Sequence, residues 1–151
     1  MLDIVLFSIP EALVVAWLAN TLSGTRLPRL KLMFVGAITG VISNFTRKTT
    51  SFFALHMIVY ACAMAVLFGI VETANAWKRG VSVIIALPLY LLVEYYNILI
   101  VRHFVSLERL GESLVLKLLC FAPQIFATLL LILFLKRTGF SLFLNPQNEE
   151  V

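Results

Sequence analysis

The chain has 151 residues, of which 61% are hydrophobic and 13% are charged, and its mean hydropathy is +0.99. An ordinary soluble domain is about 45–50% apolar and about a quarter charged, so this composition excludes a water-soluble globule and predicts an all-α membrane protein. The net charge of +4 does not indicate a nucleic-acid partner, because the basic residues lie in short stretches between apolar runs, where membrane orientation accounts for them.

Five apolar stretches approach the roughly 20 residues that a helix needs to cross a bilayer. In chain order they occupy residues 2–22, 30–46, 51–71, 81–101 and 114–135. The first begins near the acidic Asp3 and is interrupted by Pro10 and Glu11, unlike a signal peptide, so we expect it to be retained. The second is the least apolar, and we allow it to be short, tilted or partly re-entrant. We expect a single domain over residues 1–151, a bundle of about five transmembrane helices followed by a tail over residues 136–151.

The basic residues predict an orientation. The connectors after the first and third stretches and the tail together carry seven Lys and Arg residues. The opposite side carries four, or five when Lys117 is included. Because Lys and Arg are enriched in cytoplasmic loops, we expect the N-terminus outside and the C-terminus in the cytoplasm, in a multi-pass protein of a bacterial inner membrane.

Polar residues inside the stretches are the candidate functional residues. Ionisable side chains at membrane depth are costly, face the bundle interior, and indicate a function by default. With the N-terminus outside, nearly all of them fall in the outer half of the bundle. Tyr90, Glu94 and Asn97 are spaced i, i+4, i+7 and share one helix face. The predicted ligand-binding residues are Glu11, His56, Tyr60, Tyr90, Glu94, Asn97, Lys117 and Gln124.

The same residues have a structural interpretation. A Glu–Lys or Glu–His pair between helices can simply hold them together, and interhelical polar contacts in membranes commonly contribute about 0.6–2 kcal/mol. Glu11, directly after Pro10, can also favour the N-terminus of a helix that restarts there. The sequence leaves both interpretations open.

Small residues predict close helix packing. Gly36 and Gly40 form a GxxxG motif in the second stretch, and Ala61, Ala65 and Gly69 continue a ridge of small residues in the third. Such ridges let helix backbones approach closely. We expect the second and third stretches to pack on each other, with homodimerisation as the alternative use.

Enzyme motifs are absent from the sequence. It contains no H-E-x-x-H, G-x-S-x-G or phosphate-loop pattern, and its two cysteines, Cys62 and Cys120, fall inside apolar stretches without metal-ligand spacing. We therefore expect no enzymatic activity, no metal and no cofactor.

Four short segments give the chain a resemblance to a known family. They are Ile9-Pro10-Glu11-Ala12, Arg47-Lys48 before Phe52-Phe53-Ala54-Leu55-His56, Ala122-Pro123-Gln124, and Lys136-Arg137 followed by Ser141-Leu142-Phe143. In these segments the chain resembles the N-terminal membrane sensor module of Gram-positive histidine kinases of the accessory-gene-regulator and sporulation type. The resemblance implies signal transduction within a two-component system, with a cytoplasmic kinase or response regulator as partner. The phosphoacceptor helix and ATP-binding domain of that family are not in this sequence, so we expect the chain itself to phosphorylate nothing.

Three functions fit these observations. The first is a sensor module that binds a small ligand, a peptide or a lipid in an outer-half pocket and signals to a cytoplasmic partner. The second is the substrate-binding subunit of a small transporter. The third is a structural membrane subunit without a ligand. The confinement of polar groups to the outer half favours the first, since a solute pathway should leave polar residues in the inner half as well.

Overall fold

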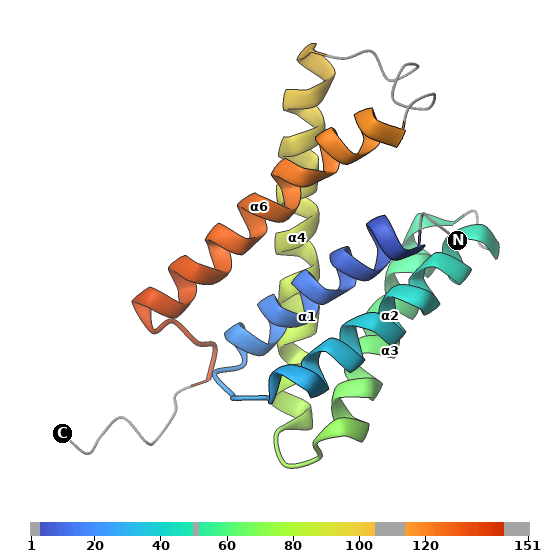
Figure 1. Ribbon diagram of the computed structural model, residues 1–151. Coiled ribbons are helices and arrows are strands. Elements are labelled where there is room, and N and C mark those ends of the chain that lie inside the picture. The colour runs from blue at the N-terminus through green and yellow to red at the C-terminus, as the bar shows by residue number, and fades with distance from the viewer. Residues whose placement is uncertain (1–3, 50–51, 105–113, 144–151) are drawn as a thin grey trace.

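The computed structural model describes residues 4–49, 52–104 and 114–143, which are almost entirely helical (Figure 1). The chain begins with a short π-helical turn, η1 (Ile4–Ser8). Five α-helices follow: α1 (Ile9–Leu22), α2 (Arg29–Thr49), α3 (Phe53–Val71), α4 (Ala76–Phe104) and α6 (Leu114–Thr138). The all-α fold expected from the sequence is confirmed, and no strand occurs within these ranges. The predicted connector at residues 108–112 and the end of the tail lie outside the described residues.

Two helix boundaries differ from the expectation. We placed Trp77, Lys78 and Arg79 in a connector, but α4 begins at Ala76 and includes all three. We also placed Lys136 in the tail, whereas α6 continues to Thr138. At the end of α6 the Lys136 side chain is exposed and can reach outward from the helix end. At the start of α4 the Arg79 side chain is instead buried and held by an ion pair.

Helix α1 is the central element of the bundle. It contacts α2, α4 and α6, while α3 packs against α2 and α4 on the far side (Figure 1). Half of the 14 residues of α1 are buried, among them Val15 and Leu18. Successive helices run in opposite directions, so the start of α1, the end of α4 and the start of α6 lie at one end of the molecule.

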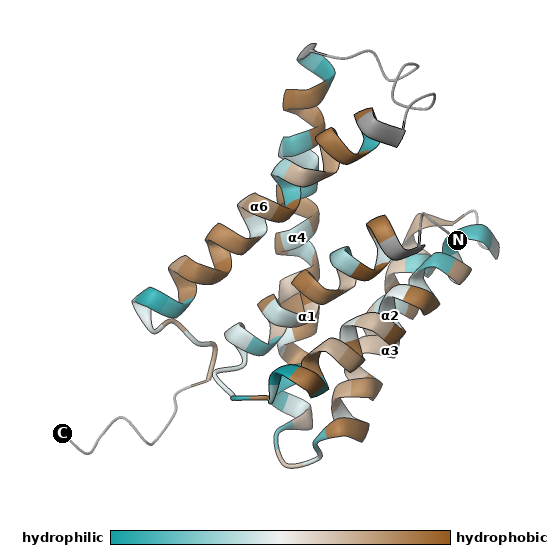
Figure 2. Cartoon of the chain, viewed as in Figure 1, coloured by the Kyte–Doolittle hydropathy of each residue, from teal (hydrophilic) through white to brown (hydrophobic). Residues whose placement is uncertain are grey.

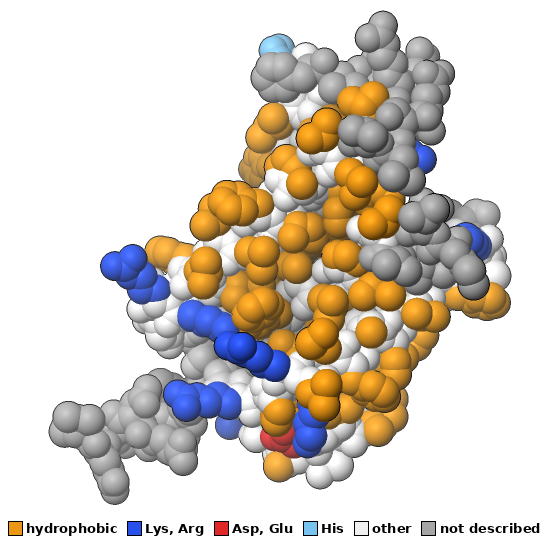
Figure 3. All heavy atoms as spheres, viewed as in Figure 1, with side chains coloured by type: hydrophobic (Ala, Val, Ile, Leu, Met, Phe, Trp, Pro, Cys, Tyr) orange, Lys and Arg blue, Asp and Glu red, His pale blue; other side chains and the backbone are white. Residues whose placement is uncertain are grey.

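Among the described residues, three helices are long and apolar enough to cross a membrane. They comprise Phe53–Val71, Ala76–His103 and Leu116–Thr138. Leu6–Leu22 is apolar but shorter, and α2 has the length of a span but is less apolar, as we expected for the second stretch. Apolar residues occupy the middle of α6, and hydrophilic ones lie near its end (Figure 2). The face drawn in Figure 3 is apolar over its middle, and Lys and Arg side chains gather near the end of α6.

The glycines of α2 pack on α1, not on α3 as we expected. A Cβ atom added at Gly36 would lie 2.8 Å from Leu13 Cα, and one added at Gly40 would lie 2.7 Å from the Ser8 carbonyl oxygen. Only glycine permits these approaches. The second and third stretches do pack on each other as expected, but the GxxxG motif brings the backbone of α2 against the central helix and not against α3.

The small residues of α3 face α4. Ala65 Cβ lies 4.0 Å from the position of a Cβ at Gly80, and Ala76 Cβ lies 3.8 Å from that of a Cβ at Gly69. Ala61 packs against the apolar core. These contacts are ordinary van der Waals packing within the chain, and dimerisation through the same ridge stays a prediction.

An ion pair is buried at the end of the bundle where α4 begins. Arg79 is fully buried, and its Nη2 donates to Glu72 Oε1 at 3.1 Å. Its Nε donates to Thr25 Oγ1 at 3.0 Å. The cluster thus joins the connector after α1 to the connector before α4. It also corrects our expectation that this half of the bundle is almost purely apolar.

The segment after α6 packs back onto the same end. The Leu142 amide donates to the Leu22 carbonyl oxygen at 2.8 Å, and Trp77 and Phe143 stack edge to face at 4.9 Å. The end of α6 is therefore attached to the end of α1.

Candidate functional site

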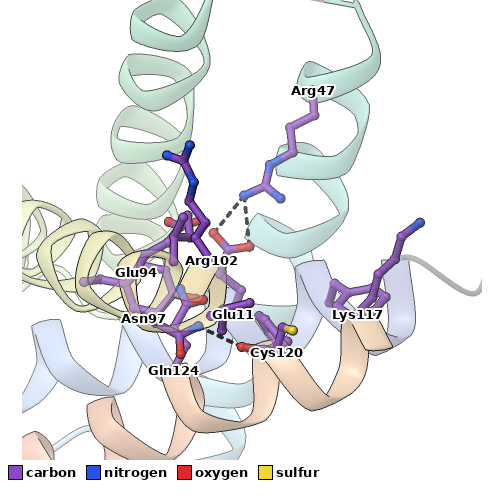
Figure 4. Close-up of a pocket in the computed structure, with 13 residues that line it drawn as sticks. Glu11, Arg47, Glu94, Asn97, Arg102, Lys117, Cys120 and Gln124 are labelled. Atoms are coloured by element: carbon purple, nitrogen blue, oxygen red, sulfur yellow. Dashed lines mark hydrogen bonds and ion pairs between the residues drawn. The ribbon is translucent and has the colours of Figure 1, made fainter. Parts of the chain in front are cut away.

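A cavity of about 350 Å³ lies at the opposite end of the bundle, between η1, α1, α2, α4 and α6. Six of the eight predicted ligand-binding residues line it (Figure 4): Glu11, Tyr90, Glu94, Asn97, Lys117 and Gln124. They come from three helices that are distant in the sequence, so the fold gathers the polar faces that helical spacing predicted. This volume lies within the range of small-molecule sites.

Arg47 is the principal residue that the sequence analysis missed. It lies in the last turn of α2, and its Nη2 donates to both carboxylate oxygens of Glu11, at 2.8 and 2.9 Å (Figure 4). Its Nε donates to His56 Nε2 at 3.2 Å. One guanidinium thus connects α1, α2 and α3, which suits its planar fork of donors.

His56 and Tyr60 lie beside the cavity and do not line it. His56 is buried and accepts the Arg47 hydrogen bond through Nε2, which requires an unprotonated nitrogen at that position. Tyr60 is buried one turn further along α3, with a hydroxyl group that has no hydrogen-bond partner among the described residues. His56 therefore helps to hold the Arg47 side chain in place, and neither His56 nor Tyr60 lines the cavity where a ligand would bind.

Glu94 differs from Glu11 in having no hydrogen bond or ion pair to a described residue. We considered Lys117 a partner for a buried carboxylate, but in the structure the Lys117 side chain extends away from Glu94 (Figure 4). Arg47, which is within electrostatic range, directs its hydrogen bonds to Glu11 and His56. The Glu94 carboxylate therefore lines the cavity without a direct partner among the described residues, and Arg47 acts on it only through the electrostatic field.

Two neutral side chains connect the cavity to α6. Asn97 Nδ2 donates to the Cys120 carbonyl oxygen at 2.7 Å (Figure 4), in the turn before Pro123. A proline inside a helix disturbs the hydrogen bonds of the preceding turn, and neighbouring side chains can satisfy the freed carbonyl groups. Gln124, on the following turn, is buried and lines the cavity.

Apolar side chains form the rest of the wall. Phe7 of η1 and Phe121 of α6 stack edge to face at 5.3 Å, and Ile98 and Val101 contribute from α4. Arg102 lines the cavity one residue after Val101 and is exposed. The site therefore combines an apolar wall, a free carboxylate and cationic side chains, which suits an amphiphilic molecule.

The missed residues share one feature. Arg47, Arg79 and Arg102 were assigned to connectors and counted as orientation signals, and Arg47 also contributed to the family resemblance, but none was predicted to belong to the site. Each lies instead within the first or last turns of a helix that is longer than its apolar stretch. One signal could have identified the pairing of Arg47 with Glu11. Glu11 lies at the start of the first helix and Arg47 at the end of the second, and two consecutive antiparallel helices bring these ends to the same side of the bundle.

No protein-family model, curated protein or solved structure matches the chain. The resemblance to histidine-kinase sensor modules therefore stays a prediction. Within the described residues, no group of three or more His, Cys, Asp or Glu side chains could hold a metal ion.

Proposed function

We propose that the chain is a membrane-embedded receptor module that binds a small amphiphilic ligand in the cavity and passes a helix movement to a cytoplasmic partner. The observation that carries this proposal is the Glu94 carboxylate, which faces a cavity of about 350 Å³ without a partner among the described residues. An unpaired charge at membrane depth is costly, and a ligand that pairs with it would remove that cost.

The comparison with the other carboxylates supports a ligand role for Glu94. Glu11 is held by Arg47, and Glu72 is held by Arg79. Each of these ion pairs joins two elements of the bundle, so Glu11 and Glu72 have a structural role. Glu94 takes part in neither pair, so helix attachment does not explain its presence.

The packing of α6 supports a route for the signal. The cavity lies between α4 and α6 near the start of α6, and the segment after α6 is attached to the end of α1 through Leu142 and Leu22. A ligand that changes the separation of α4 and α6 would move this attachment. We propose that this end faces the cytoplasm of a bacterial cell, as its basic residues favour, and that a kinase or response regulator receives the signal there.

A cavity-filling variant tests the proposal. Val101→Trp places an indole in the cavity wall, whereas Ile100→Trp places the same group on a residue that is 61% exposed and does not line the cavity. The full chain is reconstituted in nanodiscs and titrated with a panel of small amphiphiles. We expect Val101→Trp to abolish binding of the compounds that bind the unmodified chain, and Ile100→Trp to preserve it. Equal binding by both variants would refute a ligand site in this cavity.

A further inference from the structure

The charges that line the cavity do not all pair with one another among the described residues. Glu11 and Arg47 form a bidentate pair, which leaves Glu94 as the anion, and Arg102 and Lys117 as cations without a partner among the described residues. Glu94 is partly buried, whereas both cations are exposed. The free charges therefore have opposite signs at different positions, one inside the cavity and two at its rim.

Further hydrogen-bond acceptors line the same cavity as Glu94. Tyr90 is 1% exposed, and its hydroxyl group has no hydrogen-bond partner among the described residues. Asn97 uses Nδ2 as the donor to the Cys120 carbonyl oxygen, so its Oδ1 is left as an acceptor. Gln124 is 6% exposed and offers a further amide oxygen. An ammonium group has three donors and no acceptor. It could therefore donate to the Glu94 carboxylate and to the neutral oxygen acceptors that line the same cavity.

The rim lies at a defined distance from Glu94. Arg102 follows Glu94 by eight residues on the same helix, which places its Cα about 12 Å further along the axis of α4. Ile98 and Val101 lie between them and line the cavity. Along this wall of α4 the cavity thus presents first the Glu94 carboxylate, then an apolar surface, and then the Arg102 cation.

From this order we infer that the ligand is a zwitterionic amphiphile, with an ammonium group at Glu94, an apolar middle against α4 and an anionic group at Arg102 and Lys117. This inference rests on the proposed function, since it names the chemical class of the ligand for the same cavity. The separation excludes an aminophospholipid headgroup, whose ammonium and phosphate groups are only two carbons apart, and indicates a free amino acid with widely separated charges.

The test uses three eight-carbon probes that differ in their charges and one shorter zwitterion. The full chain in phosphatidylglycerol nanodiscs is titrated with ω-aminooctanoate, octylamine and octanoate, and with the shorter ω-aminobutanoate. We expect ω-aminooctanoate to bind at least about 10-fold more tightly than either singly charged probe, since a hydrogen-bonded charge typically contributes that much. We also expect ω-aminobutanoate to bind weakly, because it cannot reach both ends.

Variants assign the two ends. Glu94→Gln should weaken ω-aminooctanoate about 10-fold and leave octanoate unchanged, whereas Arg102→Gln should weaken both acids about 3-fold, as expected for an exposed charge. Repeating the titration with phosphatidylethanolamine in the nanodisc is a length control. We expect unchanged affinity, because its two charges lie too close together to reach both ends, and competition by this lipid would contradict the inferred order of groups along the wall.

Two results would overturn the inference, and they are distinguishable from failure of the proposed function. If octylamine or octanoate binds as tightly as ω-aminooctanoate, or if Glu94→Gln changes no affinity, the ligand is not a zwitterion held by Glu94. If Val101→Trp then still blocks the probes, the cavity remains a binding site of another class. A third result, binding by none of the probes, would also show that the zwitterion assignment is wrong.

Discussion

The contact between α1 and α2 gives the sharpest stability prediction. Replacing Gly40 by Ala adds one methyl group at a position where a Cβ would lie 2.7 Å from the Ser8 carbonyl oxygen and 2.8 Å from Ile9 Cα. Both atoms belong to the backbone, so neither can rotate away. Overpacking of this kind costs about 1–3 kcal/mol, whereas Gly→Ala inside a helix contributes about 1 kcal/mol of stabilisation. We therefore expect Gly40→Ala to lower the free energy of unfolding by up to about 2 kcal/mol.

Gly80→Ala is the matched control for this prediction. A Cβ at Gly80 would lie 4.0 Å from Ala65 Cβ, which is ordinary contact, so the helix gain of up to about 1 kcal/mol should appear without a clash. The assay is reversible unfolding by dodecyl sulfate in mixed micelles, followed by circular dichroism. A Gly40→Ala protein as stable as Gly80→Ala would refute the close packing of α2 on α1.

Three further predictions concern charge and orientation. Arg79→Met should lower the free energy of unfolding by about 3 kcal/mol in the same assay, because it leaves Glu72 unpaired; a smaller loss than for the neighbouring Lys78→Met would contradict the buried pair. Arg47→Gln should cost about 1–3 kcal/mol through the loss of charged hydrogen bonds to Glu11. Arg47→Lys should restore only part of it, because Arg47 donates to Glu11 from Nη2 and to His56 from Nε, and Lys has a single nitrogen; full recovery with Lys would show that charge alone suffices. A reporter fused after Val151 should be active only in the cytoplasm, as the basic residues indicate, and activity of a fusion on the outer face would reverse the orientation.

The sequence predicted the helices more fully than the contacts between them. Five apolar stretches became five helices, and the i, i+4, i+7 spacing of Tyr90, Glu94 and Asn97 placed all three on the cavity, because helical periodicity is a local property. Helix partners are not local. Gly36 and Gly40 permit close approach to any helix, and only the folded arrangement assigns them to α1.

The charges illustrate the same limit. A Lys or Arg next to an apolar stretch reads as a loop residue that sets orientation, yet Arg79 is fully buried and Arg47 reaches Glu11 on another helix. Side-chain reach of this kind depends on where each helix ends and on which helix lies beside it. The sequence therefore identified the carboxylates of the site but not the cation that neutralises one of them.

The most direct test of ligand binding at Glu94 is the carboxylate ¹³C chemical shift of each glutamate, measured by NMR on labelled protein in nanodiscs as ω-aminooctanoate is added. Assignment uses the Glu94→Gln and Glu72→Gln variants. We expect the Glu94 signal to shift on saturation while the Glu72 signal, at the opposite end of the bundle, stays unchanged. A shift at Glu72 alone, or no shift at Glu94 with the probe bound, would contradict a site at Glu94.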